Sequence, residues 1–211
     1  MPMNAAERQK LVRDLADSDF DRQSQAANRL GSSADPDDIE AALHALNTTS
    51  NRLLRDTLSE ALVENAPNSL GLVLKCIADS PQSRSGENCL HIAGEIAYRQ
   101  EADRDRRIVP ALLDAIRATL PAGTRVLGPA VAALRECARA GPILQANDLL
   151  LEVVSAAARE SDPDLFALQN AAEILMLNDG KAMRDKLERR LEGLDPDSMA
   201  AQVVAKVVGA D

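Results

Sequence analysis

Apolar residues recur every three or four positions through most of this chain, which is the spacing of one face of an amphipathic helix. No segment alternates apolar and polar residues for long enough to predict a strand. The pattern predicts an all-α protein of about twelve helices. The second of these helices is expected to end at residue 31. The other eleven are expected at 4–16, 36–46, 51–65, 68–79, 87–100, 108–119, 125–140, 146–160, 163–177, 181–192 and 197–208.

Short polar residues mark the expected helix starts. Asp17 and Asp19 are N-cap candidates for the second helix. The run Asp35-Pro36-Asp37-Asp38 combines an N-cap aspartate, a proline at the first helical position and acids in the first turn. We expect the fourth helix to be capped by Thr48, Thr49 or Ser50.

Glycine and proline mark the expected ends and breaks. Gly31 is predicted to end the second helix as a C′ glycine. Asn178-Asp179-Gly180 is a predicted turn between the tenth and eleventh helices. Pro129 either begins the eighth helix or kinks it.

One short unit recurs along the chain. Asp17, Asp19, Ala26-Ala27 and Leu30 reappear 145 positions later as Asp162, Asp164, Ala171-Ala172 and Leu175. The same register aligns Leu30 with Leu62, Ile96, Leu134, Leu175 and Val208. Such recurrence predicts stacked helical hairpins, each of which buries its apolar face only against its neighbours. About six two-helix repeats account for nearly all of residues 1–211, which we predict to form a single domain.

The repeated unit resembles the HEAT-repeat family, within the HEAT/armadillo class, over residues 4–208. The residues that carry the resemblance are Leu11–Leu15, Asp17, Asp19, Arg22, Ala26-Ala27 and Leu30-Gly31. The family often has an arginine where Arg22 lies, but the aligned positions here are Leu54, Asn88, Val126, Ala167 and Ala200. The repeats are therefore degenerate, and no subfamily is indicated. The resemblance implies a right-handed α-solenoid whose second helices line the concave side.

The charge pattern bears on the class of partner. The net charge is −9, and a phosphate backbone would be repelled overall, so no nucleic acid is expected. Residues 36–66 carry six acids against two bases and residues 148–180 seven against one, whereas residues 108–147 carry four bases against two acids. This pattern favours a partner with a basic surface. A solvated helix surface that binds nothing is the alternative.

The cysteines and the apolar runs bear on the compartment. Cys76, Cys89 and Cys137 lie in apolar periodic segments without a Cys-x-x-Cys motif, which is typical of reduced core cysteines. No apolar stretch has the length of a membrane span, and residues 1–8 lack the pattern of a signal peptide. We predict a cytoplasmic protein that does not enter a membrane.

Two groups of polar residues could carry chemistry. Glu87, His91 and Glu95 share one helix face and could hold a metal or an acid–base pair, but a solvated face is the alternative, and we expect neither metal nor cofactor. Arg135 and Arg139 could clamp a carboxylate or phosphate, although Glu136 lies beside them. There is no Gly-x-Ser-x-Gly motif and no glycine-rich phosphate loop, so no catalytic residue is predicted.

These observations predict a non-catalytic protein–protein interaction scaffold or adaptor, with an immunity or inhibitor protein that captures a basic partner as a specialised version. The expected contact residues are polar positions beside the core stripe of the second helices: Gln25, Arg29, Arg55, His91, Glu95, Arg135, Arg139, Asn170 and Glu173.

Two other functions stay open. Some HEAT-like proteins attach bilins to phycobiliproteins and others remove alkylated bases from DNA, so an enzyme or enzyme subunit is the alternative. The DNA-repair version is less favoured, because the chain is acidic and has no tryptophan. The third hypothesis is a homodimer through the apolar final helix, which contains Val203, Val204, Val207 and Val208.

Overall fold

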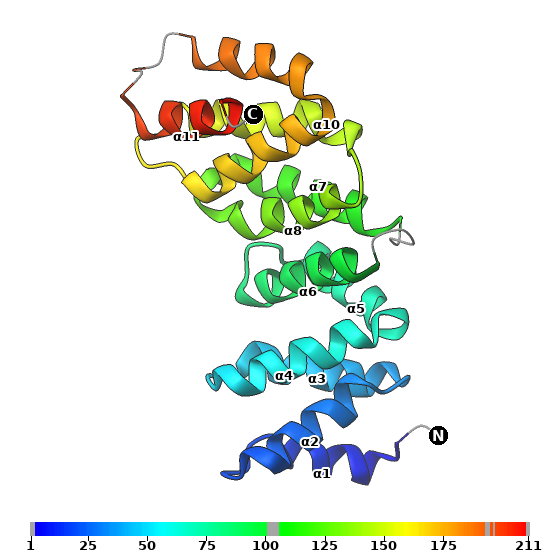
Figure 1. Ribbon diagram of the computed structural model, residues 1–211. Helices are drawn as coiled ribbons and strands as arrows, with labels where there is room; N and C mark the ends of the chain where they lie inside the picture. The colour runs from blue at the N-terminus through cyan, green and yellow to red at the C-terminus, as the bar shows by residue number, and fades with distance from the viewer. Residues whose placement is uncertain (1–2, 101–105, 193–194, 196, 210–211) are drawn as a thin grey trace. The chain divides into compact units, whose positions relative to one another are not determined.

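The computed structural model describes residues 3–100, 106–192, 195 and 197–209 (Figure 1). Over these residues it contains eleven α-helices and three short 3-10 helices, and none of these residues lies in a strand. The expectation of an all-α protein is confirmed. In the described part of the chain, no helix joins enough length to enough apolar character to span a bilayer.

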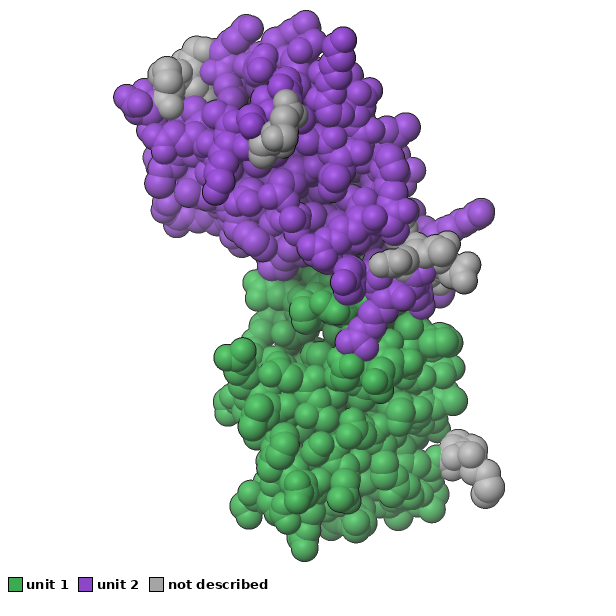
Figure 2. All heavy atoms as spheres, in the orientation of Figure 1, with its two compact units in different colours: residues 1–96 green, residues 97–211 purple. Residues whose placement is uncertain are grey.

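The chain divides into two compact units, residues 1–96 and residues 97–211, with the boundary inside helix α6 (Figure 2). The helices of unit 1 are α1 (Ala5–Asp14), α2 (Phe20–Gly31), α3 (Pro36–Thr48), α4 (Arg52–Glu64), α5 (Ala66–Asp79) and most of α6 (Arg84–Gln100). Within this unit α1 packs on α2 and α3, α2 packs on α3 and α4, and α3 packs on α4 and α5.

Unit 2 contains the remaining helices. They are α7 (Ile108–Thr119), η2 (Leu120–Ala122), η3 (Thr124–Val126), α8 (Gly128–Arg139), η4 (Leu144–Ala146), α9 (Asn147–Ala157), α10 (Leu165–Leu191) and α11 (Met199–Val208). Helix α10 packs on α8, α9 and α11, and α7 packs on α8. Helix α10 is therefore the element against which most of this unit is assembled.

Most expected helix starts are found, and one is wrong. Asp19 and Asp35 cap α2 and α3 through their side chains, and Pro36 lies at the start of α3. The cap of α4 is Asn51, not Thr48, Thr49 or Ser50. The Asn51 side chain accepts hydrogen bonds from the N–H groups of the first helical turn, whereas the Thr49 hydroxyl accepts a bond from the Asn51 N–H.

The prediction for Gly31 is also wrong. The residue is the last of α2, the cap is Ser32, and Gly31 does not have a positive φ. A Cβ at this position would lie 2.6 Å from the Cβ of Ala61 on α4. Glycine is needed here because two helices approach closely, not because the chain turns.

The position of Pro129, which the sequence left open, is resolved, and the expected turn at residues 178–180 is located. Pro129 lies in the first turn of α8, where its missing N–H has no helical partner to lose. The expected turn at residues 178–180 appears as a break inside α10, where Asp179 has φ −162° and ψ 83°. The helical stretches on either side of this break correspond to the two helices expected there, and together they form α10.

The register of the repeated unit agrees with burial. Its six anchor positions are all buried: Leu30, Leu62, Ile96, Leu134, Leu175 and Val208. Three residues before each anchor, Ala27, Ala93, Val131 and Ala172 have no exposed surface, whereas Ser59 is half-buried and Ala205 is exposed. The recurring apolar positions therefore form the cores of both units.

Candidate functional site: a groove on α8, α10 and α11

A groove of about 640 Å³ lies in unit 2, where side chains of α8, α10 and α11 meet. Its lining combines four apolar side chains with charged and amide groups. The lining residues are Arg135, Gln169, Glu173, Met176, Leu177, Gly180, Val203, Lys206 and Val207. We call this set the α10–α11 groove. A concave site of this size with a few polar groups is the usual form of a binding surface.

The apolar part of the groove follows from how α10 and α11 face the core. On α11, Val204 and Val208 are buried, so Val203 and Val207, one position earlier, fall on the adjacent face and stay half-buried. On α10, Ile174 and Leu175 take the core positions, which leaves Leu177 54% exposed. Exposed apolar side chains on two adjacent helices form one continuous surface here.

The polar part of the groove is an ion pair that is held on both sides. The Arg135 guanidinium donates from Nε to one oxygen of Glu173, and the Gln169 amide donates to the other oxygen at 2.8 Å. The Arg135 and Glu173 side chains are 31% and 24% exposed. A partly buried pair with both carboxylate oxygens bonded has a fixed position, so it can act as a rigid edge of the groove.

The ion-pair network continues along α8. Glu136 lies between the two arginines, 3.8 Å from the Arg135 guanidinium and 3.1 Å from that of Arg139. The Arg139 guanidinium is also 5.5 Å from the centre of the Tyr98 ring, within the range of a cation–π contact. A carboxylate or phosphate bound between Arg135 and Arg139 would have to compete with these internal contacts.

The five expected contact residues of unit 1 lie on α2, α4 and α6. Gln25 and Arg29 are exposed on α2, and Arg29 pairs with Glu7. Arg55 is half-buried and donates to the Thr49 carbonyl at 3.3 Å. On α6, His91 is exposed and Glu95 is half-buried. None of the five lines the α10–α11 groove.

Asn170 is buried, whereas His91 lies on an exposed face of α6. Asn170 is 5% exposed, donates to the Phe166 carbonyl at 2.8 Å and does not line the groove. Glu87 and His91 are exposed on α6. Among the described residues, no three His, Cys, Asp or Glu side chains gather closely enough to hold a metal ion.

Four of the lining residues, Arg135, Glu173, Val203 and Val207, are among those named from the sequence, whereas Gln169, Met176, Leu177 and Lys206 are not. A signal for part of this set was present. Residues 174–177 read Ile-Leu-Met-Leu, and four consecutive apolar residues cover more of a helix than one core-facing stripe. At least one of them has to face away from the core.

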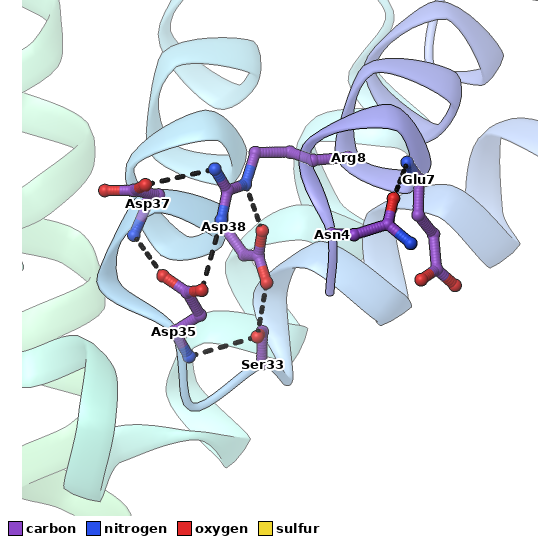
Figure 3. Close-up of polar contacts among 7 residues, drawn as sticks. All are labelled: Asn4, Glu7, Arg8, Ser33, Asp35, Asp37 and Asp38. Carbon is purple, nitrogen blue, oxygen red and sulfur yellow. Dashed lines mark hydrogen bonds and ion pairs between the residues drawn. The ribbon is translucent and has the colours of Figure 1, made fainter. Parts of the chain in front are cut away.

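A second polar cluster lies in unit 1, at the start of α3 (Figure 3). Arg8 from α1 pairs with Asp38, with Asp37 at 3.0 Å and with Asp35 at 3.1 Å. The Ser33 hydroxyl donates to Asp38 at 2.7 Å. Because these groups satisfy one another across α1 and α3, the cluster fastens two helices together and is not a candidate site.

No protein-family model matches the sequence, and no curated protein matches it significantly.

Proposed function

We propose that this protein is a non-catalytic protein-binding scaffold of HEAT-like helical repeats, which binds its partner through the α10–α11 groove. The observation that carries this proposal is the apolar surface of the groove, where Leu177 is 54% exposed beside the half-buried Met176, Val203 and Val207. Contiguous apolar surface with a polar rim is typical of protein-binding sites.

The repeat architecture that we propose is a right-handed α-solenoid of about six hairpins. In unit 1 the first helices follow one another, α1 on α3 and α3 on α5, while the second helix α2 packs on α4. In unit 2 the second helix α8 likewise packs on α10. Packing of like helices on like helices is expected of stacked hairpins, and it supports the resemblance to HEAT repeats.

The partner that we propose is a protein with an apolar centre and a basic rim. Residues 148–180, which include the first part of α10, carry seven acids against one base. An acidic field attracts basic partners and speeds their encounter, while apolar contacts at the centre of an interface supply most of the affinity. An adaptor or an inhibitor of a basic protein would use such a surface.

The groove's own chemistry favours binding over catalysis. Arg135 and Gln169 both donate to Glu173, so both oxygens of the Glu173 carboxylate already have partners. Such a set fixes the shape and charge of a surface. An enzyme on the same scaffold, of the chromophore-lyase or DNA-glycosylase kind, is the alternative that the experiment below also examines.

The test compares three immobilised forms of the full chain in a quantitative pull-down from a native lysate. Leu177→Lys places a charge in the groove. Leu144→Lys makes the same change at a leucine of unit 2 that is 63% exposed but does not line the groove. We expect the wild type and Leu144→Lys to retain one protein at a constant molar ratio, and Leu177→Lys to retain about tenfold less, since loss of one central contact costs about 1.4 kcal/mol or more.

Each other result has a distinct meaning. Equal retention by Leu177→Lys would remove the groove as the binding site. Equal loss from both variants, with unchanged circular dichroism spectra, would mean that the change of charge rather than its position matters. Retention of a pigment or other small molecule in place of a protein would favour the enzyme alternative.

A further inference from the structure

Two cysteines that are distant in the sequence meet in unit 1. Cys76 lies on α5 and Cys89 on α6, and the two side chains interact closely enough for the Cys89 thiol to stabilise a thiolate at Cys76. Both are free thiols. Cys89 has no exposed surface, whereas Cys76 is half-buried. The pair therefore consists of one buried thiol, Cys89, and one solvent-accessible thiol, Cys76.

Cys76 lies on the wall of a hollow of about 460 Å³. The hollow is open to solvent, and six of its nine lining residues have polar or charged side chains. These six are Glu40, Lys75, Asp79, Ser80, Ser83 and Ser85. An ammonium group, two carboxylates and three hydroxyl groups thus surround the accessible sulfur, which suits a small zwitterionic solute.

The turn between α5 and α6 holds the two cysteines in place. Gly86 is packed so closely against this turn that a Cβ there would lie 2.1 Å from the Ser80 carbonyl oxygen. The Ser83 hydroxyl also donates to that carbonyl, at 2.8 Å. A tightly packed turn with internal hydrogen bonds fixes how α5 and α6 approach each other at the ends that carry the two cysteines.

Electrostatics makes the accessible thiol the reactive one. The hydrogen bond from Cys89 lowers the pKa of Cys76 to about 7, against the opposing effects of burial and of the Asp79 carboxylate. The same hydrogen bond, together with burial, raises the pKa of Cys89. Since the thiolate is the nucleophile, Cys76 reacts first at neutral pH.

We propose that Cys76 and Cys89 form a reversible dithiol–disulfide pair, which is oxidised by a low-molecular-weight disulfide of the peptide type that enters the hollow beside Cys76. The Cys76 thiolate attacks one sulfur of the disulfide, forms a mixed disulfide and releases one thiolate. The Cys89 sulfur then attacks the Cys76 sulfur, which closes the Cys76–Cys89 bond and expels the second thiolate. The Cys89 proton ends on that leaving group, so one disulfide is reduced to two thiols while the protein loses two hydrogen atoms.

The hollow is the reason for choosing a disulfide as the oxidant. An exchange reaction needs room for an organic group on the far side of the attacked sulfur, and the hollow provides it next to Cys76. The third cysteine, Cys137, lies in unit 2, has no exposed surface and lines neither this hollow nor the α10–α11 groove.

The full chain is incubated with oxidised glutathione and the reaction is stopped with acid. The masses of the intact protein and of its cysteine-containing peptides are then measured. We expect the wild type to lose two hydrogen atoms and to yield a cross-linked peptide pair containing Cys76 and Cys89. Cys89→Ser is expected to accumulate the mixed disulfide on Cys76. Cys76→Ser is expected to react more slowly than the wild type by a factor of roughly ten or more. Cys137→Ser is the matched control and is expected to behave as the wild type.

Several outcomes would overturn the proposal. They are a Cys76→Ser variant that reacts as fast as the wild type, a wild-type mixed disulfide that never closes, and a wild type that does not react at neutral pH. A measurement on the wild type alone guards against variants that fail to fold. Native alkylation should label Cys76 before Cys137, at a rate that rises with pH around a midpoint of about 7. Equal labelling of the two would also overturn the proposal.

Discussion

Asp38 is a charged residue with no exposed surface, and its surroundings explain how the fold tolerates it. Its carboxylate accepts hydrogen bonds from Arg8 and from Ser33 (Figure 3). The hydrogen bond to Asp38 raises the pKa of Arg8, whose guanidinium is charged even without this contact. A buried carboxylate is acceptable when it is paired and hydrogen-bonded in this way.

We expect Asp38→Asn to lower the free energy of unfolding by about 1–3 kcal/mol, because the amide cannot accept both bonds as well as the carboxylate does. The matched control is Asp37→Asn. Asp37 also pairs with Arg8, but its side chain is 71% exposed, so its loss should cost less than about 1 kcal/mol. Urea unfolding followed by circular dichroism measures both. Equal shifts in the two variants would show that burial of Asp38 is not what matters.

The sequence could reveal one half of this cluster and not the other. The run at residues 35–38 has the chemistry of a helix start, and the structure confirms that Asp35 caps α3. Nothing local indicates that Asp38 is buried, because its partner Arg8 lies thirty positions away and both residues are usually found at the surface. Local capping is readable from a sequence, whereas pairing between distant charges depends on how the helices pack.

The same division holds for the helices. All eleven described α-helices begin or end close to expected positions, because caps, prolines and apolar spacing act within one or two turns. Contacts between different helices depend on residues that are distant in the sequence. Asn178, for example, accepts a hydrogen bond from the Ile143 N–H at 2.6 Å and donates to the Ile143 carbonyl at 3.0 Å. These bonds join the break in α10 to the segment before α9, and no sequence motif predicts them.

Gly31 gives a test of packing between α2 and α4. Gly31→Ala would force the new Cβ against the Cβ of Ala61, which lies only 2.6 Å away, so we expect a loss of about 1–3 kcal/mol in the free energy of unfolding. Gly71→Ala is the matched control on α5, where a Cβ would meet nothing within 4 Å. That change should stabilise the protein by about 0.5–1 kcal/mol, since alanine favours helices. Effects of the same sign in both variants would contradict the close approach of α2 and α4.

Across the whole molecule, one register runs through both units. The anchor leucine or its equivalent is buried at all six positions, three of them in residues 1–96 and three in residues 97–211. A periodic sequence can reveal such a register, because each repeat buries the same face. It cannot reveal the α10–α11 groove, which exists because Leu177, Val203 and Val207 face outward at a place where two particular helices meet.

The groove also bears on the third hypothesis, a homodimer. Val203 and Val207 of α11 are half-buried within one chain, and both line the groove. A second copy could cover this apolar surface, in which case the same patch would be used on both subunits. We expect such a dimer to dissociate in Val207→Lys. In an isologous interface the new lysine is present on both subunits, and the two positive charges would repel each other.

The oligomeric state of each form is measured by light scattering coupled to size-exclusion chromatography over a range of protein concentrations. Val12→Lys is the matched control, since Val12 is 45% exposed on α1 and does not line the groove. A wild type that is dimeric at high concentration, together with a monomeric Val207→Lys and an unchanged Val12→Lys, would assign the groove to self-association. A wild type that stays monomeric throughout would leave the groove open for a different protein, so the outcome also decides how the pull-down with Leu177→Lys is interpreted.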